Sequence, residues 1–67
     1  MTYTGIVVFS DSHAECTVET EAEARRWVET ESAARPSDFD SGQVLRNHPM
    51  RRVVASYSRG EGWIANG

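Results

Sequence analysis

The stretch TEAEARRWVETESAA, residues 20–34, decides the fold because it carries both a start signal and a stop signal for a helix. Thr20 and Glu23 have the spacing of a capping box, in which each side chain satisfies the backbone N–H of the other residue. Acidic residues crowd the start of the stretch and Arg35 closes its end, as the helix dipole favours. Pro36 then prevents continuation, because it has no N–H and its ring clashes with the preceding turn. We therefore predict one helix over residues 20–34.

The predicted helix has one apolar face. Four residues share it at the helical period: Ala24, Trp27, Val28 and Ala34. Trp27 is the only large side chain among them, so we expect its ring to lie flat on a sheet. On the outer face the spacing predicts ion pairs between Glu21 and Arg25 and between Glu31 and Arg35.

Two strands are predicted before the helix. Residues 3–10 (YTGIVVFS) are rich in β-branched and aromatic residues and are apolar on both faces, which is typical of a central strand covered on each side. Residues 11–13 form a tight turn. Residues 14–19 then alternate apolar and polar, which predicts a second strand with one wet face. Cys16 falls on its buried side, where we expect a packed, inert thiol.

The segment after the helix, residues 35–42 (RPSDFDSG), has the composition of a loop. Phe39 is its one large apolar residue, and it either packs under the end of the helix or is offered to a partner. Val44 and Leu45 predict a short third strand. Asn47, His48 and Pro49 end it, because proline cannot donate to a strand ladder.

Two further strands are predicted near the C-terminus. Residues 51–57 (RRVVASY) form the fourth, with Val53, Ala55 and Tyr57 on one side. Residues 58–62 (SRGEG) make a turn, and residues 63–65 pair back as the fifth strand. All strand-to-strand links are short, so neighbouring strands should be antiparallel. We predict a single small α+β domain over residues 1–67, in which an antiparallel sheet of four to five strands carries one helix across one face, in the order ββαβββ.

Charge is unevenly distributed along the 67 residues, although the net charge is only −3. All seven basic residues are arginine, and the first two thirds of the chain are acidic whereas the last third is basic. Such asymmetry indicates a charged partner, and the alternative is a well-solvated surface. The single cysteine excludes an intramolecular disulfide. The sequence has neither an apolar run of membrane-spanning length nor a signal-peptide layout, so we expect a cytoplasmic protein.

Catalytic and metal chemistry find little support in the sequence. Zinc could draw on His13, Cys16 and His48, but a structural zinc needs four ligands and only three are plausible. No nucleophile motif is present, and the Gly60-x-Gly62 pair sits in a hairpin rather than between a strand and a helix, where a phosphate loop would lie. We therefore predict a protein that is not an enzyme and that has no cofactor and no metal.

Two charged groups of residues are candidates for partner binding. The first, the basic–aromatic group, comprises Arg46, Arg51, Arg52, Tyr57, Arg59 and Trp63. The second, the acidic group, comprises Glu21, Glu23 and Glu29. Arginine beside stacking aromatic rings suits single-stranded nucleic acid or an acidic protein edge. The net negative charge disfavours general DNA binding, because phosphate affinity depends on cations. A protein-binding module is therefore favoured over a nucleic-acid-binding module, and an accessory subunit of a larger assembly is the third interpretation.

The C-terminal stretch VLRNHPMRRVVASYSRGEGWI (residues 44–64), after TVETEAEARRW (residues 17–27), resembles one group of small phage anti-CRISPR proteins. The resemblance lies in the order of elements: an apolar strand ending in arginine, a strand ending in Ala-x-Tyr, then a glycine turn and a tryptophan followed by an aliphatic residue. It implies a non-catalytic inhibitor that binds a type I RNA-guided surveillance complex (Cascade-type) and blocks the surface receiving target DNA.

The resemblance further implies a protein partner and no direct need for nucleic acid or membrane; the oligomeric state is open. The sheet-side residues of the basic–aromatic group are the first candidate contact surface, and the acidic group is the second.

Overall fold

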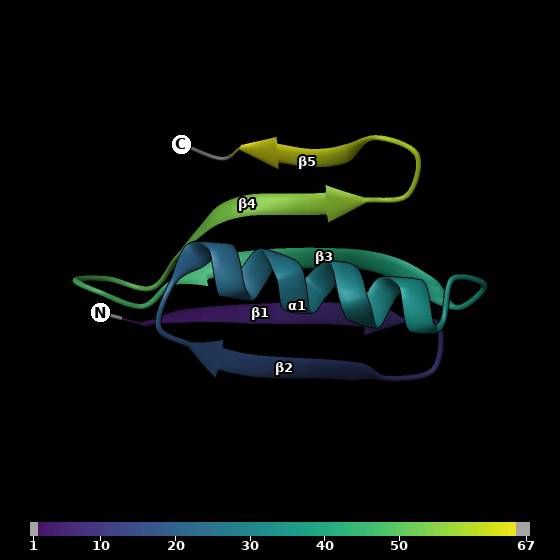
Figure 1. The fold of residues 1–67 in the computed structure, drawn as a ribbon, viewed down its shortest axis with the longest axis horizontal. Coiled ribbons are helices and arrows are strands. Elements are labelled where there is room, and N and C mark those ends of the chain that lie inside the picture. Colours follow the sequence, from purple (N-terminus) through teal and green to yellow (C-terminus); the bar gives the residue numbers. More distant parts are fainter. Residues whose placement is uncertain (1, 66–67) are drawn as a thin grey trace.

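The computed structural model describes residues 2–65 as one antiparallel sheet of five strands with one helix across one face (Figure 1). The elements are β1 (Tyr3–Phe9), β2 (His13–Val18), α1 (Glu21–Ala34), β3 (Phe39–Arg46), β4 (Arg52–Ser58) and β5 (Gly62–Ala65). The strand order across the sheet is β2-β1-β3-β4-β5. The predicted α+β architecture and element order are confirmed. The helix is too short and too polar to cross a membrane, and residues 2–65 contain no other helix.

The helix begins where the capping box predicts. Thr20 is the N-cap, and its hydroxyl oxygen accepts a hydrogen bond from the backbone N–H of Glu23 at 3.1 Å. The reciprocal contact differs in detail, because the carboxylate of Glu23 accepts from the hydroxyl of Thr20 at 3.1 Å. Arg35 is the C-cap. Both ends are therefore fixed by the residues that the sequence indicates.

The helix lies close to the sheet because the two central strands carry glycine beneath it. A Cβ atom at Gly42 would lie 2.6 Å from Cγ1 of Val28, and one at Gly5 would lie 2.9 Å from Cε3 of Trp27. Val28 is fully buried at this contact, whereas Trp27 is only partly buried at the edge of the core. Tight seating over β1 and β3 thus depends on the absence of two side chains.

The last turns of α1 differ from the predicted apolar face. Ala34 is exposed, and Ser32 is buried in its place. The burial of Ser32 is tolerated because its hydroxyl donates to the backbone carbonyl of Glu29 at 2.9 Å.

The third strand is much longer than predicted, and the loop prediction for residues 35–42 is wrong at its C-terminal end. β3 begins at Phe39, which is buried under the helix end as one of the two alternatives predicted. A register shift near Phe9 places Phe39 opposite that residue, so the buried positions Phe39 and Gly42 are three apart. This irregularity conceals the strand from a search for simple alternation.

The fourth strand carries a second irregularity. Ala55 pairs with Val44 and Val53 pairs with Leu45, so Val54 is an extra residue. Val54 packs against the core, and Val53 lies on the other face of the sheet from Ala55. The predicted grouping of Val53 with Ala55 and Tyr57 is therefore wrong, because a bulge resets the alternation.

The face of the sheet opposite α1 is uncovered within residues 2–65. Ile6 and Val8 of β1 lie on this face and are half-buried by neighbouring side chains, and Ile64 of β5 is 44% exposed. β1 is central as predicted, but its predicted second cover is not present in this part of the chain.

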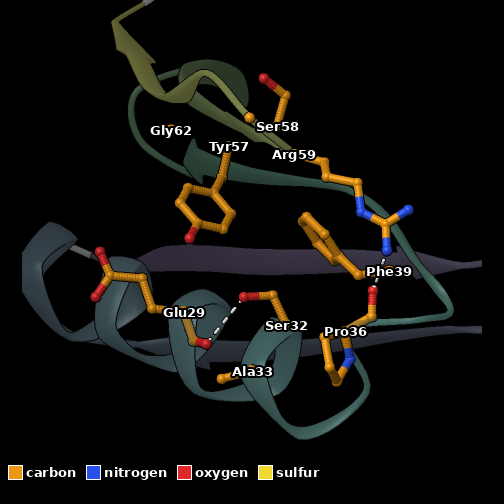
Figure 2. A pocket seen from close by; sticks show the side chains of 10 residues that line it. Glu29, Ser32, Ala33, Pro36, Phe39, Tyr57, Ser58, Arg59 and Gly62 are labelled. Atoms are coloured by element: carbon orange, nitrogen blue, oxygen red, sulfur yellow. Dashed lines mark hydrogen bonds between the residues drawn. The ribbon is translucent and has the colours of Figure 1, made fainter.

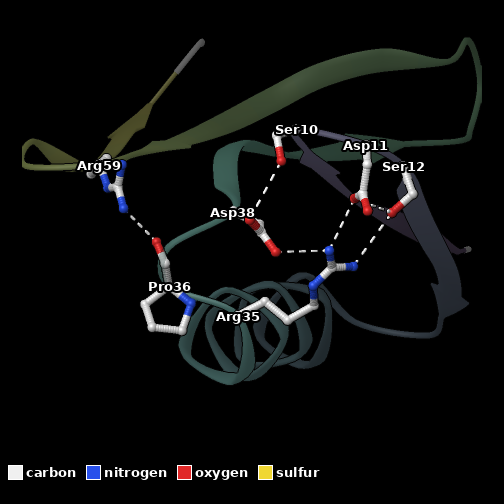
Figure 3. Close-up of polar contacts among 7 residues, drawn as sticks. All are labelled: Ser10, Asp11, Ser12, Arg35, Pro36, Asp38 and Arg59. Carbon is white, nitrogen blue, oxygen red and sulfur yellow. Dashed lines mark hydrogen bonds and ion pairs between the residues drawn. The ribbon is translucent and has the colours of Figure 1, made fainter.

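Arg35 joins the end of the helix to the β1–β2 turn (Figure 3). Its Nη2 atom donates to Oδ1 of Asp11 and to Oδ2 of Asp38, both at 2.9 Å. Its guanidinium lies 4.5 Å from the centroid of the Phe9 ring. The predicted pairing of Arg35 with Glu31 is wrong, because the C-cap residue has left helical geometry and points toward β1. The Arg35 hydrogen bond and charge hold the pKa of Asp11 below its ordinary value of 3.8.

We expect Gly42→Ala to lower the free energy of unfolding by about 1–3 kcal/mol, because the new methyl group would meet Val28 in a close-packed core. Urea denaturation measures the change. Gln43→Ala, at the exposed position next along the same strand, is the matched control and should change stability by less than about 0.5 kcal/mol. Equal effects of the two variants would contradict the close approach.

We expect Asp11→Asn to reduce stability at neutral pH and to have progressively less effect in acid. The folded-state pKa of Asp11 is depressed, so its stabilisation is fully present above the ordinary value of 3.8 and is lost as the pH falls through the folded-state pKa. Thermal unfolding from pH 7 to pH 2 measures the difference between wild type and variant. In an Arg35→Gln background the effect should shrink to the part due to the hydrogen bond from Ser12, and an undiminished effect there would exclude Arg35 as the main cause.

Candidate functional site

The basic–aromatic group does not form one surface. Arg46 pairs with Arg52 at one end of the β3–β4 ladder, whereas Tyr57 pairs with Trp63 toward the other end of β4. Arg59 lies in the β4–β5 turn, beyond Tyr57. The six predicted residues therefore divide between two sites at opposite ends of β4.

The first site is a groove between the C-terminal half of α1 and the β4–β5 hairpin, with a volume of about 320 Å³ (Figure 2). Phe39 and Tyr57 line it, with ring centroids 5.7 Å apart, and the ring of Trp63 packs on Tyr57 with centroids 4.8 Å apart. Ala33 and Pro36 contribute from the helix side. The groove thus has an aromatic floor between two elements that are distant in sequence.

Acidic side chains from α1 close one side of the aromatic row. Nε1 of Trp63 donates to Oε2 of Glu29 at 2.7 Å. The guanidinium of Arg25 lies 4.9 Å from the centroid of the Trp63 ring and pairs with Glu21 at 2.7 Å. The acidic group and the aromatic residues, predicted as parts of two separate surfaces, therefore meet on one. Glu23 is the exception, since it is engaged in the helix cap.

Arg59 closes the other end of the groove. Its guanidinium donates to the backbone carbonyl of Pro36, just after the helix, and so ties the β4–β5 turn to α1 (Figures 2 and 3). Gly60 and Gly62 both have positive φ, at 87° and 76°, which allows the tight turn that brings Arg59 there.

The charged side chains around the groove are paired, whereas the buried Oγ of Ser58, which also lines the groove, has no hydrogen-bond partner. Glu29 binds Trp63, Arg25 binds Glu21, and Arg59 binds a backbone carbonyl. The Tyr57 and Trp63 rings pack against each other at a tilt of 43°, and Arg25 covers Trp63, so these rings are not presented as a free platform for bases. These contacts between α1 and the β4–β5 hairpin, made by Glu29 and Arg25 with Trp63 and by Arg59 with Pro36, are here called the seam. The groove chiefly follows this seam.

The second site, here called the basic end, consists of Arg46, Pro49, Met50, Arg51 and Arg52 around the β3–β4 loop. A hollow of about 420 Å³ lies among Arg46, Pro49, Met50 and Arg52. Met50 is 74% exposed, the largest exposure of any large apolar side chain in residues 2–65. The ion pairs described for residues 2–65 involve Arg25 and Arg35 and none of these three arginines. The basic end therefore combines three arginines that form no ion pair within residues 2–65 with the exposed apolar side chain of Met50.

The zinc ligands considered from the sequence are not brought together. His13 pairs with Val8 and Cys16 pairs with Gly5, positions on opposite faces of the sheet. His48 lies in the β3–β4 loop, at the other end of the sheet from His13. No group of three or more His, Cys, Asp or Glu side chains within residues 2–65 could hold a metal ion.

Comparison of the chain with protein-family models, curated proteins and solved structures finds no match.

Two contributors to these sites were not singled out from the sequence. Met50 was not assigned to any element or site from the sequence, and its exposure beside Pro49 and two arginines is known only from the structure. Arg25 was assigned only to its pair with Glu21, whereas it also covers Trp63. That second contact joins residues far apart in sequence and could not be inferred from helical spacing.

We expect Glu29 and Trp63 to be coupled in stability. In a double-mutant cycle with Glu29→Ala and Trp63→Phe, which removes the donor and keeps a ring, the interaction free energy should be about 0.5–1.5 kcal/mol by urea denaturation. Glu19→Ala combined with Trp63→Phe is the control and should be additive, because Glu19 precedes the helix and is exposed. Additivity of the Glu29 cycle would show that the seam contact contributes nothing.

Proposed function

We propose that this protein is a non-catalytic inhibitor that binds a protein partner through its basic end. The observation that carries the proposal is the exposed Met50 beside three arginines without an ion pair in residues 2–65. Protein interfaces are enriched in arginine and methionine, and a few such residues carry most of the binding energy. A partner with an acidic and apolar surface complements both features.

The distribution of charge supports a protein partner over single-stranded nucleic acid. A nucleic acid needs a cationic track with free aromatic faces, but Tyr57 and Trp63 are held in the seam with Glu29. The basic end is separated from these rings along β4, and the protein as a whole carries a net charge of −3. Phosphate binding would draw on only one small end of the molecule.

The partner we propose is a type I RNA-guided surveillance complex in the cytoplasm of a phage host. This rests on the resemblance of residues 17–27 and 44–64 to small anti-CRISPR proteins, and the second of these stretches contains the whole basic end. Anchored there, the protein would obstruct the surface that receives target DNA. The exposed carboxylates of α1, Glu23 and Glu29, would add negative charge where the DNA would otherwise lie.

The test is capture of purified type I surveillance complex on the immobilised protein, with and without nuclease. We expect recovery of the complex to resist nuclease and the bound complex to lose affinity for target DNA. In the Arg51→Glu/Arg52→Glu variant, recovery should fall about tenfold or more, because charge reversal opposes an acidic surface.

Arg26→Glu is the matched control, because Arg26 is an exposed arginine on α1 that does not line the hollow of the basic end. Its recovery should equal that of wild type. Loss of recovery on nuclease treatment would favour the nucleic-acid-binding alternative. Absence of any binding to the complex would contradict this choice of partner.

A further inference from the structure

The basic end contains an unfavourable arrangement of charge. Arg46 of β3 lies directly opposite Arg52 of β4 in the sheet register. Like charges at directly opposed positions of an antiparallel pair destabilise it. Arg51, next along the chain, adds a third positive charge, and no carboxylate within residues 2–65 forms an ion pair with any of them. Stability alone would favour an acidic residue at one of the two opposed positions.

The polar atoms of Arg46 show a second unmet requirement. Arg46 is half-buried, and its Nε–H is buried without a hydrogen-bond partner. A buried donor without an acceptor costs free energy, and most buried polar groups in folded proteins are paired. The same residue thus lacks both a counter-charge and an acceptor, and it lines the hollow that it shares with Arg52.

We propose that Arg46 and Arg52 form a clamp for a carboxylate side chain of an acidic protein segment, and that Met50 and Pro49 receive an apolar side chain beside it. This deepens the proposed function and rests on it, since it names the chemistry that the partner presents. A carboxylate between the two guanidinium groups would relieve their repulsion and would offer an acceptor to the Nε–H of Arg46. The hollow of about 420 Å³ falls within the range of binding pockets for small groups, about 300–1,000 Å³.

The surroundings favour a carboxylate on a protein over a phosphate on a nucleic acid. Met50 is 74% exposed at the rim of the hollow, and an apolar side chain there gains nothing from a solvated phosphate. At the groove, the Glu29 carboxylate beside Trp63 would repel a continuing phosphate chain, and Arg25 is already paired with Glu21. A single acidic side chain followed by an apolar one fits both the charge and the exposed surface.

The first test is an NMR titration that follows the Nε–H signals of the arginine side chains. The probes are the blocked peptide acetyl-EDLEDL-amide, its neutral counterpart acetyl-QNLQNL-amide and a short single-stranded DNA oligonucleotide. We expect the acidic peptide to shift the Arg46 and Arg52 signals, and we expect its affinity to fall about tenfold in Arg52→Gln. Equal binding of the neutral peptide, tighter binding of the oligonucleotide, or unshifted Arg46 and Arg52 signals would each overturn the clamp.

The second test measures how far the repulsion between Arg46 and Arg52 lowers the stability of the free protein. Arg52→Glu replaces the repulsion with an attractive cross-strand pair, so its Tm should rise by about 2–6 °C while binding of the acidic peptide is lost. Arg51→Glu is the control, because Arg51 precedes β4 and has no paired position opposite Arg46; its Tm should change by less than about 2 °C. A lower Tm for Arg52→Glu would show that the two arginines do not repel each other and would overturn the proposal.

The two proposals fail in different ways. If capture of the surveillance complex is lost in Arg51→Glu but unaffected in Arg46→Gln and Arg52→Gln, the basic end binds protein without the clamp. If the acidic peptide binds as expected but the surveillance complex does not, the clamp is supported and the choice of partner is wrong.

Discussion

The close approach of α1 to the two central strands is the constraint on which the rest of the structure depends. Gly42 and Gly5 let Val28 and Trp27 descend onto β3 and β1, where side chains would hold the helix away. With the helix low, Val7, Val28 and Val44 are completely enclosed, although the chain has only 67 residues. A small protein has few side chains with which to fill a core. The helix must therefore lie close to the sheet if those side chains are to be enclosed. The position of α1 then determines which residues of the hairpin it can reach.

The sequence was sufficient for the helix and for the order of the elements because those signals are local. Thr20, Glu23 and Pro36 act on their immediate neighbours, and the physics of caps does not depend on the sheet. The failures occurred where the regular alternation of strands is broken. The register shift at Phe39 and the extra residue at Val54 each place two inward side chains at irregular spacing. Such breaks are set by pairing with other strands, which no single stretch of sequence records.

The candidate sites were only partly predictable for a related reason. All nine predicted contact residues are of types that suit a charged interface. The structure, however, distributes them differently from the two groups predicted from the sequence. Trp63 contacts Glu29 of the helix, whereas Arg46 and Arg52 lie at the other end of β4 from Trp63. The basic end remained together because Arg46, Arg51 and Arg52 flank one loop. The proximity of residues that are near in sequence was therefore predictable. The proximity of residues on elements that are distant in sequence became visible only in the structure.

The attachment of the β4–β5 hairpin has a consequence for motion. The helix packs on β1, β2 and β3, and β4 contributes Ala55 to the core, whereas β5 at the sheet edge is held by its ladder with β4 and by the contacts of Trp63 with Tyr57, Glu29 and Arg25. Elements with few buried contacts open first in native proteins, at a cost well below that of global unfolding. The amides of β5 would then exchange with solvent before those of β1. A partner that bridges β3 and β4 from their shared end would slow that exchange and make the molecule a single cooperative unit.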